Sequence, residues 1–316
     1  MTSASAAPQF TIAVEGGDLT VHDLSGPEAG ADAPLVVLVH GITANGLSWG
    51  STAAALADDP ATSRCRVWAP DLRGRAGSRG VGSDGDQYGL AAHVADLVAL
   101  ADHAQVERFV LVGHSMGGFI GALAAVTIPA RLHGVVLVDG GPAFPPPPDL
   151  DIDAALQAVI GPAMARLSMT FADDGAYLDF WRQHPAVAPL LAGPHADAVT
   201  AYLLHDLIDA PDGSGQKVSS CVVDAIRADG RDVLADERTH VGVRVAAEAG
   251  VPIEFIWAQR GLLNEDQGLY DEQRIAALQL PAQVSVTAVR DVNHYSVIFD
   301  PAGTTIIRDA VARILR

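Results

Sequence analysis

Cysteine is scarce in this sequence, with only Cys65 and Cys221 among its 316 residues. Two cysteines are too few for a disulfide framework, and they lack metal-ligand spacing, so we expect both to be small apolar side chains that are buried or half-buried. Secretion signals have a basic segment and a long apolar core, and residues Met1 to Pro8 contain neither. Together these absences favour a cytoplasmic protein.

Basic residues are also few. The 20 lysines and arginines stand against 38 acidic residues, the formal net charge is −18, and Lys217 is the only lysine. Nucleic acids and anionic membranes are bound through basic surfaces, so this charge argues against both as partners. No apolar run reaches the roughly 18 residues that a membrane span requires. We therefore expect a soluble protein.

Short apolar runs are present, and they alternate with helical patterns. Residues 35–39, Leu-Val-Val-Leu-Val, suit a strand that is covered on both faces. Such alternation predicts βαβ units and a parallel sheet, preceded by a hairpin between residues 10–14 and 19–24. Further strands are predicted at 65–69, 109–112, 134–138, 253–257 and 284–289, and helices at 48–57, 90–104, 116–126 and 301–315.

The alternation stops at Pro145 to Pro148, four consecutive prolines that fit neither a helix interior nor a central strand. Beyond them the pattern is helical up to residue 247, with helices predicted at 153–167, 176–184, 195–209 and 217–228. This stretch also contains five of the chain's 17 Phe, Tyr and Trp residues. We therefore predict an α/β core domain, residues 1–142 and 248–316, with an inserted helical cap at 143–247.

One serine lies where a strand meets a helix. The segment Gly113 to Gly117 fits the pattern G-x-S-x-G, whose glycines allow the sharp turn that lifts the Ser115 hydroxyl above the strand ends. A serine hydroxyl is a weak nucleophile at neutral pH and needs an adjacent base. His294 is the candidate base, because it follows the last strand and so lies at the same carboxyl edge of a parallel sheet.

Three features, in this order, resemble the α/β-hydrolase family: His40-Gly41 after one strand, the G-x-S-x-G segment after another, and Asn293-His294 after the last. Asp71-Leu72-Arg73-Gly74, with Gly77-Ser78, is also similar to a structural loop of that family. The resemblance covers the chain apart from the cap. It implies an α/β-hydrolase fold, a mostly parallel, doubly wound sheet with an inserted helical cap.

The same resemblance implies an oxyanion hole made of two backbone N–H groups. These would be the N–H of Met116, directly after the nucleophile, and the N–H of Ile42, directly after His40-Gly41. Gly41 would allow the backbone to approach the substrate closely, and His40 is expected to be structural.

The acidic member of the catalytic triad is where this chain departs from the commonest family pattern. That pattern places an aspartate shortly after the strand at 253–257, but Gly261 stands there. An acid is still needed, because a carboxylate holds the imidazole in the right tautomer and stabilises its charged form. We favour Asp139, which ends a strand at the catalytic edge, since some relatives carry the acid there. The alternatives are Glu265, Asp266 and Asp291.

The remaining histidines do not predict a metal site. His114 adjoins the nucleophile but is expected to point elsewhere. The cap histidines have no ligand-like spacing, and we assign them to the polar part of the cap: His184, His195, His205 and His240. No cofactor is expected.

A serine at the elbow indicates acyl transfer, since the family's dehalogenases and epoxide hydrolases use an aspartate nucleophile. The expected substrate is a small hydrophobic ester or lactone, with a macrolactone of the zearalenone type as the narrowest prediction. Cap residues such as Phe180, Trp181 and Tyr202 would enclose it. Three alternatives stay open: a carbon–carbon bond hydrolase, a haloperoxidase-like enzyme and a non-catalytic ligand receptor. The sequence also leaves homo-oligomer formation open.

Overall fold

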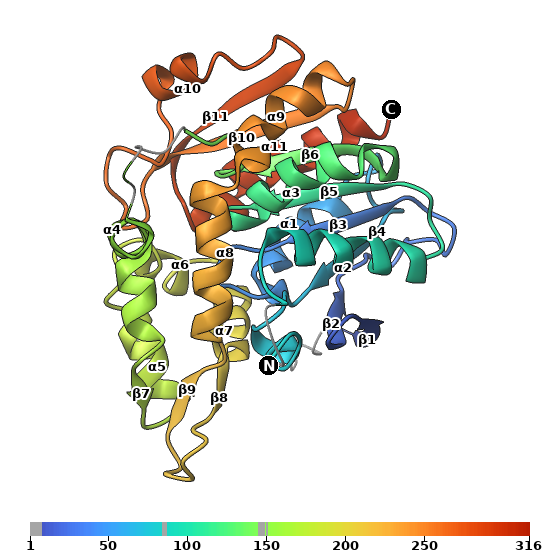
Figure 1. Cartoon of the computed structure of the whole chain (residues 1–316). Coiled ribbons are helices and arrows are strands. Elements are labelled where there is room, and N and C mark those ends of the chain that lie inside the picture. The colour runs from blue at the N-terminus through green and yellow to red at the C-terminus, as the bar shows by residue number, and fades with distance from the viewer. Residues whose placement is uncertain (1–7, 84–86, 145–148, 150) are drawn as a thin grey trace.

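The computed structural model describes residues 8–83, 87–144, 149 and 151–316, so the prolines at 145–148 lie outside the described residues. An eight-stranded sheet dominates the molecule, with the strand order β1-β2-β4-β3-β5-β6-β10-β11 (Figure 1). β1 (Gln9–Val14) and β2 (Gly17–Asp23) form an antiparallel hairpin at one edge. The other strands are parallel to one another: β3 (Leu35–Val39), β4 (Arg66–Pro70), β5 (Phe109–His114), β6 (Leu132–Val138), β10 (Ile253–Arg260) and β11 (Val284–Asn293).

Helices cover both faces of this sheet, which explains why its strands are continuous apolar runs. In β3, Val37 and Val39 belong to the apolar core beneath one set of helices, and Val36 and Leu38 belong to the core on the opposite face. The first set is α2 (Leu90–His103), α3 (Met116–Thr127) and α9 (Glu237–Glu248); the second is α1 (Gly50–Ala57) and α11 (Pro301–Ile314). Cys65 and Cys221 are both buried and free, as the sequence predicted.

The segment between β6 and α9 projects to one side of the sheet (Figure 1). Its helices are α4 (Ile152–Arg166), α5 (Asp174–Trp181), α6 (Ala188–Leu191), α7 (Ala196–His205) and α8 (Val223–Ala235). α9 falls within the predicted cap range but packs against α3 of the core. The boundaries of the cap at 143 and 247 stay a prediction, and we use "cap" below for the segment from α4 to α8.

The prediction of a helical pattern up to residue 247 did not include the three strands that this segment contains. β7 (Thr170–Phe171), β8 (Leu207–Asp209) and β9 (Lys217–Ser219) form a small antiparallel sheet in the order β7-β9-β8. The predicted helices at 195–209 and 217–228 included two of these strands. Strands of two or three residues are too short to show a period in the sequence, and pairing between distant segments stabilises them.

The cap helix α4 bends in its middle. Ile160 has φ −122° and ψ 19°, which is not helical. The bend is explained by Pro162, because proline in a helix interior has no N–H to donate to the preceding turn. The bend matters for the site, since Ile160 lines two cavities described below.

Among the described residues, no helix is long and apolar enough to cross a membrane.

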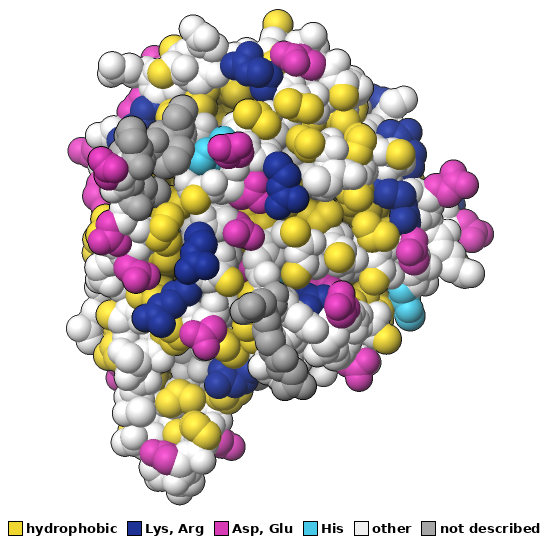
Figure 2. Space-filling model, in the orientation of Figure 1, with side chains coloured by type: hydrophobic (Ala, Val, Ile, Leu, Met, Phe, Trp, Pro, Cys, Tyr) yellow, Lys and Arg dark blue, Asp and Glu magenta, His cyan; other side chains and the backbone are white. Residues whose placement is uncertain are grey.

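Figure 2 shows one face of the molecule, where acidic and basic side chains are interspersed with apolar ones. The excess of acidic residues is therefore not gathered into a single patch on that face.

Two short helices lie near the site, η1 (Gly46–Trp49) and η4 (Ser296–Ile298). Helix α10 (Glu272–Leu278) follows β10.

Candidate active site

Ser115 occupies a strained turn between β5 and α3, with φ 55° and ψ −121°. A non-glycine residue at positive φ is unusual, and such strain at a strand-to-helix turn is a feature of nucleophile elbows. The flanking glycines are required by contact: a Cβ at Gly113 would lie 2.0 Å from the Gly117 oxygen, and one at Gly117 would lie 2.1 Å from the Val39 oxygen. The motif therefore forms the turn that the sequence predicted.

Asp139 and His294 meet at the same sheet edge. Asp139 follows β6 and His294 follows β11, and His294 Nδ1 lies 2.6 Å from Asp139 Oδ2. The other carboxylate oxygen, Oδ1, accepts a hydrogen bond from the Ala258 N–H at 3.0 Å. Asp139 is fully buried and His294 nearly so. The carboxylate is thus held by the backbone of β10 and can fix the orientation of the imidazole.

The alternative carboxylates have other contacts. Glu265 Oε2 accepts from the Leu263 N–H at 2.8 Å. Asp266 is almost completely exposed and pairs loosely with Arg260. Asp291 is exposed, in a left-handed backbone conformation on β11. Within the described part of the chain, Asp139 is the carboxylate that is bonded to His294.

A small cavity connects the nucleophile and the base. Ser115 and His294 both line it, together with Gly41, Ile42 and other mostly apolar residues. His114, which we expected to point elsewhere, also lines this cavity, and its Nε2–H donates to the backbone carbonyl of His294 at 2.8 Å. Burial and the neighbouring His294 keep the pKa of His114 well below its ordinary value, so His114 is a neutral support for the His294 loop.

The loop after β3 approaches the nucleophile closely. A Cβ at Gly41 would lie 3.2 Å from Ser115 Cβ, so glycine allows this approach. His40 Nδ1–H donates to the Gly41 carbonyl at 2.7 Å, and its Nε2 accepts from the Leu72 N–H at 2.9 Å. Because C=O and N–H point in opposite directions across a trans peptide, fixing the Gly41 carbonyl also fixes the Ile42 N–H.

His40 can hold this peptide only in its neutral form. Its Nε2 must be an acceptor while Nδ1 carries the proton, because Leu72 N–H is a donor and the Gly41 carbonyl an acceptor. Complete burial lowers the pKa of His40 to about 3, although the hydrogen bond to Gly41 opposes this effect. His40 therefore stays neutral over the physiological range and supports the loop, as the sequence predicted.

The cap aromatics divide into two groups. Tyr202 lines the cavity that contains Ser115. Phe180 and Trp181 instead pack edge to face with ring centroids 5.6 Å apart, and Trp181 also lies 6.5 Å from Tyr295. The structure places these two side chains in an aromatic cluster behind Tyr295, where they support the wall of the site.

A second, larger cavity adjoins the first. Its volume is about 450 Å³, against about 50 Å³ for the cavity at Ser115. The two cavities share four lining residues, and the outer one also contains polar groups such as His184 and Arg274. The shared residues are Ile160, Ala163, Leu262 and Tyr295. Sequence reasoning missed these residues; only Tyr295 had a signal, its place directly after His294.

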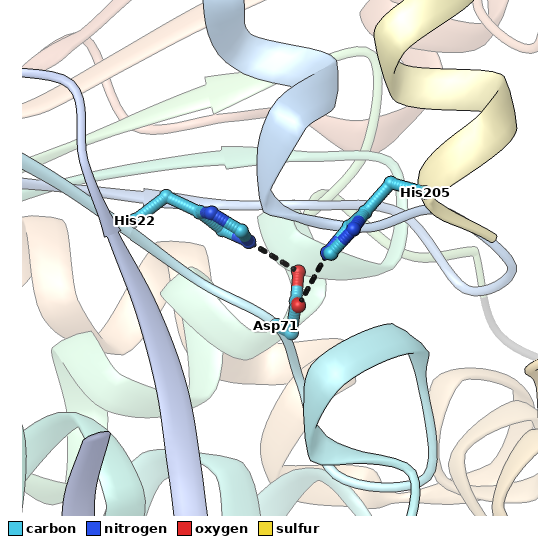
Figure 3. Close-up of side chains that lie close together, drawn as sticks. All are labelled: His22, Asp71 and His205. Atoms are coloured by element: carbon cyan, nitrogen blue, oxygen red, sulfur yellow. Dashed lines mark hydrogen bonds and ion pairs between the residues drawn. The ribbon is translucent and has the colours of Figure 1, made fainter. Parts of the chain in front are cut away.

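Figure 3 shows a separate cluster in which His22 and His205 approach Asp71 from two sides. One potential ligand atom of each residue lies within 4.8 Å of the others, so the set could hold a metal ion. However, Oδ1 already accepts from His22 Nε2 (3.1 Å) and Gly46 N–H (2.8 Å), and Oδ2 from His205 Nε2 (2.8 Å) and Gly77 N–H (3.0 Å). Four N–H donors satisfy the carboxylate, so we assign the cluster as a hydrogen-bonded link between α7 and the core.

Comparisons with known proteins agree with this fold. A sequence model described as alpha/beta hydrolase fold matches residues 34–166, the part that includes Gly41, Ser115 and Asp139. The crystal structure of an alpha/beta hydrolase from Novosphingobium aromaticivorans superposes with a TM-score of 0.71 at 20% identity, covering 98% of this chain and 100% of that one. This likeness confirms the fold that the sequence predicted.

Sequence relatives match only part of their length. A 3-hydroxybutyrate-oligomer hydrolase of Cupriavidus necator is 33% identical over 116 residues, which are 37% of this chain and 38% of the relative. An uncharacterized protein of Mycobacterium tuberculosis is 33% identical over 108 residues, 34% of this chain and 29% of the relative. The chain therefore spans about a third of the length of these curated relatives.

Proposed function

We propose that this chain, which has the α/β-hydrolase fold, is a member of that family and a cofactor-independent serine hydrolase that cleaves a carboxylic ester or lactone. The observation that carries the proposal is the 2.6 Å contact between His294 and Asp139 beside the cavity that contains Ser115. A nucleophile, a base and an acid that orients the base are the groups needed for acyl transfer.

The proposed reaction uses these groups in two steps. Ser115 Oγ attacks the substrate carbonyl while His294 Nε2 takes the serine proton, and Asp139 stabilises the imidazolium through Nδ1–H. The N–H groups of Ile42 and Met116 bind the oxyanion. His294 then gives its proton to the departing alkoxide, and a water molecule activated by the same histidine releases the acyl group from Ser115.

The sizes of the two cavities support a hydrophobic substrate with one small part and one large part. The scissile carbonyl must lie in the inner cavity of about 50 Å³, which Ser115 and His294 line. The larger part of the substrate would extend past the shared residues into the outer cavity of about 450 Å³. A macrolactone of the zearalenone type, our narrowest proposal, would have to occupy both.

Other members of the family motivate the alternatives. Carbon–carbon bond hydrolysis and a haloperoxidase-like reaction would use the same three side chains. The receptor alternative rested on the missing acid after β10, and the contact of Asp139 with His294 supports an enzyme instead. The name of the Cupriavidus relative, an oligomer hydrolase, also favours hydrolysis.

Substrate panels test the proposal. We expect the protein to hydrolyse 4-nitrophenyl acetate, 1-naphthyl acetate and lactones, and the Ser115→Ala variant to lose this activity. Cleavage of vinylogous β-diketones without cleavage of esters would instead identify a carbon–carbon bond hydrolase. Absence of turnover on all of these substrates by a folded protein would contradict the proposal.

A further inference from the structure

Arg75 is fully buried and contacts both residues of the proposed oxyanion hole. Its Nε donates to the backbone carbonyl of Ile42 at 3.0 Å, and its Nη2 lies 4.0 Å from Met116 Sδ. Arg75 comes from the loop after β4, whereas Ile42 follows β3 and Met116 begins α3. One guanidinium therefore contacts the backbone of Ile42 and the side chain of Met116, which belong to two separate segments.

The charge of Arg75 is neutralised from the cap. Its Nη1 lies 2.6 Å from Oδ2 of Asp229, a fully buried residue of α8. The carboxylate is oriented by the Gly89 N–H at 2.8 Å and by His93 Nε2 at 3.1 Å. Burial alone would raise the pKa of Asp229, but the charges of Arg75 and His93 hold that pKa below its ordinary value. Asp229 is therefore a charged partner that keeps the guanidinium in place.

A second buried arginine repeats the arrangement at the next peptide. Arg166 of α4 donates through Nη2 to the Thr43 carbonyl at 3.2 Å. Its carboxylate partner is Asp206, which follows α7, and Tyr177 OH lies 2.7 Å from Nη1. Two consecutive carbonyls of the oxyanion loop are thus held by guanidinium groups whose counter-ions both come from the cap.

We propose that Arg75 is a positioning residue of the oxyanion hole, and that Asp229 of α8 holds it there. This inference rests on the proposed serine hydrolase function. Arg75 acts through Ile42 and Met116 rather than on the substrate. Oxyanion donors stabilise charge only at the position where it develops, so a small displacement of the Ile42 N–H weakens the transition state more than the bound ester. The cap thereby takes part in building the hole.

The test separates transition-state binding from substrate binding. In Arg75→Met and in Asp229→Asn, we expect kcat for 1-naphthyl acetate to fall about 10- to 100-fold, while KM changes by less than about 2-fold. This loss of kcat should not exceed the loss caused by removing a whole oxyanion donor. Aryl trifluoromethyl ketones add to the serine and form an oxyanion, so their inhibition constant should rise by the same factor as kcat falls.

A matched ion pair between the same loop and α2 provides the control. Arg73 and Asp96 are also buried and form a bidentate ion pair at 2.5 and 2.6 Å, and Arg73 further donates to the Gln87 carbonyl. Arg73→Met and Asp96→Asn should lower the thermal midpoint comparably while kcat and the ketone inhibition constant change by less than about 3-fold. Should Arg75→Met fail to fold, Asp229→Asn and Arg75→Lys carry the test.

Two results would overturn the inference: an unchanged kcat in folded Arg75 and Asp229 variants, or an equal loss in the Arg73 and Asp96 variants. Failure of the underlying function gives a different result, because wild-type protein would then neither hydrolyse the ester nor bind the ketone.

Discussion

Asp139 is the residue on which the triad assignment turns. An asparagine at this position can still accept from the Ala258 N–H, but its amide cannot hold Nδ1–H of His294 and favours the wrong tautomer. We predict that Asp139→Asn lowers kcat about 10³- to 10⁴-fold with the fold retained. Steady-state hydrolysis and circular dichroism check both parts.

The controls for this substitution are the carboxylates that the sequence left as alternatives. Glu265→Gln and Asp291→Asn should keep kcat within about 2-fold, because the Glu265 carboxylate accepts from the Leu263 N–H and the Asp291 side chain is exposed. A loss in either variant that equals the loss in Asp139→Asn would contradict the assignment.

Single residues differ in how well the sequence predicted them. Ser115 and His294 could be found because a local motif and a place after a strand define them. Asp139 could only be ranked among four carboxylates, since its contact with His294 joins positions 155 residues apart. The roles of Arg75 and Asp229 left no local signal, because both depend on packing between the cap and the core.

Helix α7 is tied to the core by His205 at its end. Burial alone would lower the pKa of His205, but the hydrogen bond and charge of Asp71 raise it above its ordinary value. A histidine whose pKa is raised in the folded state contributes its full stabilisation at pH values below its unfolded pKa of about 6.5. This contribution is lost as pH rises through the folded-state pKa.

We therefore predict that the thermal midpoint of the wild-type protein is higher than that of His205→Gln, and that this difference is largest near pH 6. The difference should shrink steadily above about pH 6.5. Differential scanning fluorimetry of the two proteins between pH 6 and 9 measures it. A difference that stays constant over this range would show that the titration of His205 contributes nothing to the link.

Helix α4 bends at Ile160, and Ile160 lines both cavities. Ile160→Ala should widen the connection between the two cavities and raise kcat/KM for 1-naphthyl acetate relative to methyl acetate. It should also lower the free energy of unfolding by about 2 to 4 kcal/mol. Leu156→Ala is the matched control, because Leu156 is buried in the same apolar cluster on the same helix. Leu156→Ala should lose similar stability without changing the ratio of kcat/KM for the two esters. An equal change of this ratio in both variants would contradict this role of Ile160.

The elements themselves were predicted unevenly. The strands of the core are buried on both faces and read as apolar runs, so the sequence located them within one or two residues for β3 to β6. In the cap, β8 pairs with β9 and β9 also pairs with β7, but a strand of three residues is too short to show a period in the sequence.

At the scale of the whole molecule, the parallel sheet assembles the site. Gly41, Ser115, Asp139 and His294 follow β3, β5, β6 and β11, and the carboxyl ends of these strands meet at one edge. This arrangement was predictable from the order of strands and helices. The small inner and large outer cavities were not, because cap residues line them together with loops that are distant in the sequence.

The net charge of −18 also acts on the whole molecule. An acidic protein repels anionic substrates over distances that salt screens, since the Debye length is about 10 Å at 0.1 M ionic strength. We predict that kcat/KM for a 1-naphthyl ester with a free carboxylate rises as salt increases from 10 to 200 mM, while kcat/KM for 1-naphthyl acetate stays constant. A fall with salt for the carboxylate ester would indicate local attraction, for example by Arg274 in the outer cavity.

The central claim is that Ser115, activated by His294 and Asp139, forms a covalent acyl-enzyme. Labelling with a fluorophosphonate, followed by peptide mass spectrometry, tests it most directly. The account predicts one phosphonyl group per chain, located on Ser115, absent in Ser115→Ala and much slower to form in His294→Ala and Asp139→Asn. A folded protein that is not labelled, or is labelled equally after Ser115→Ala, would contradict it.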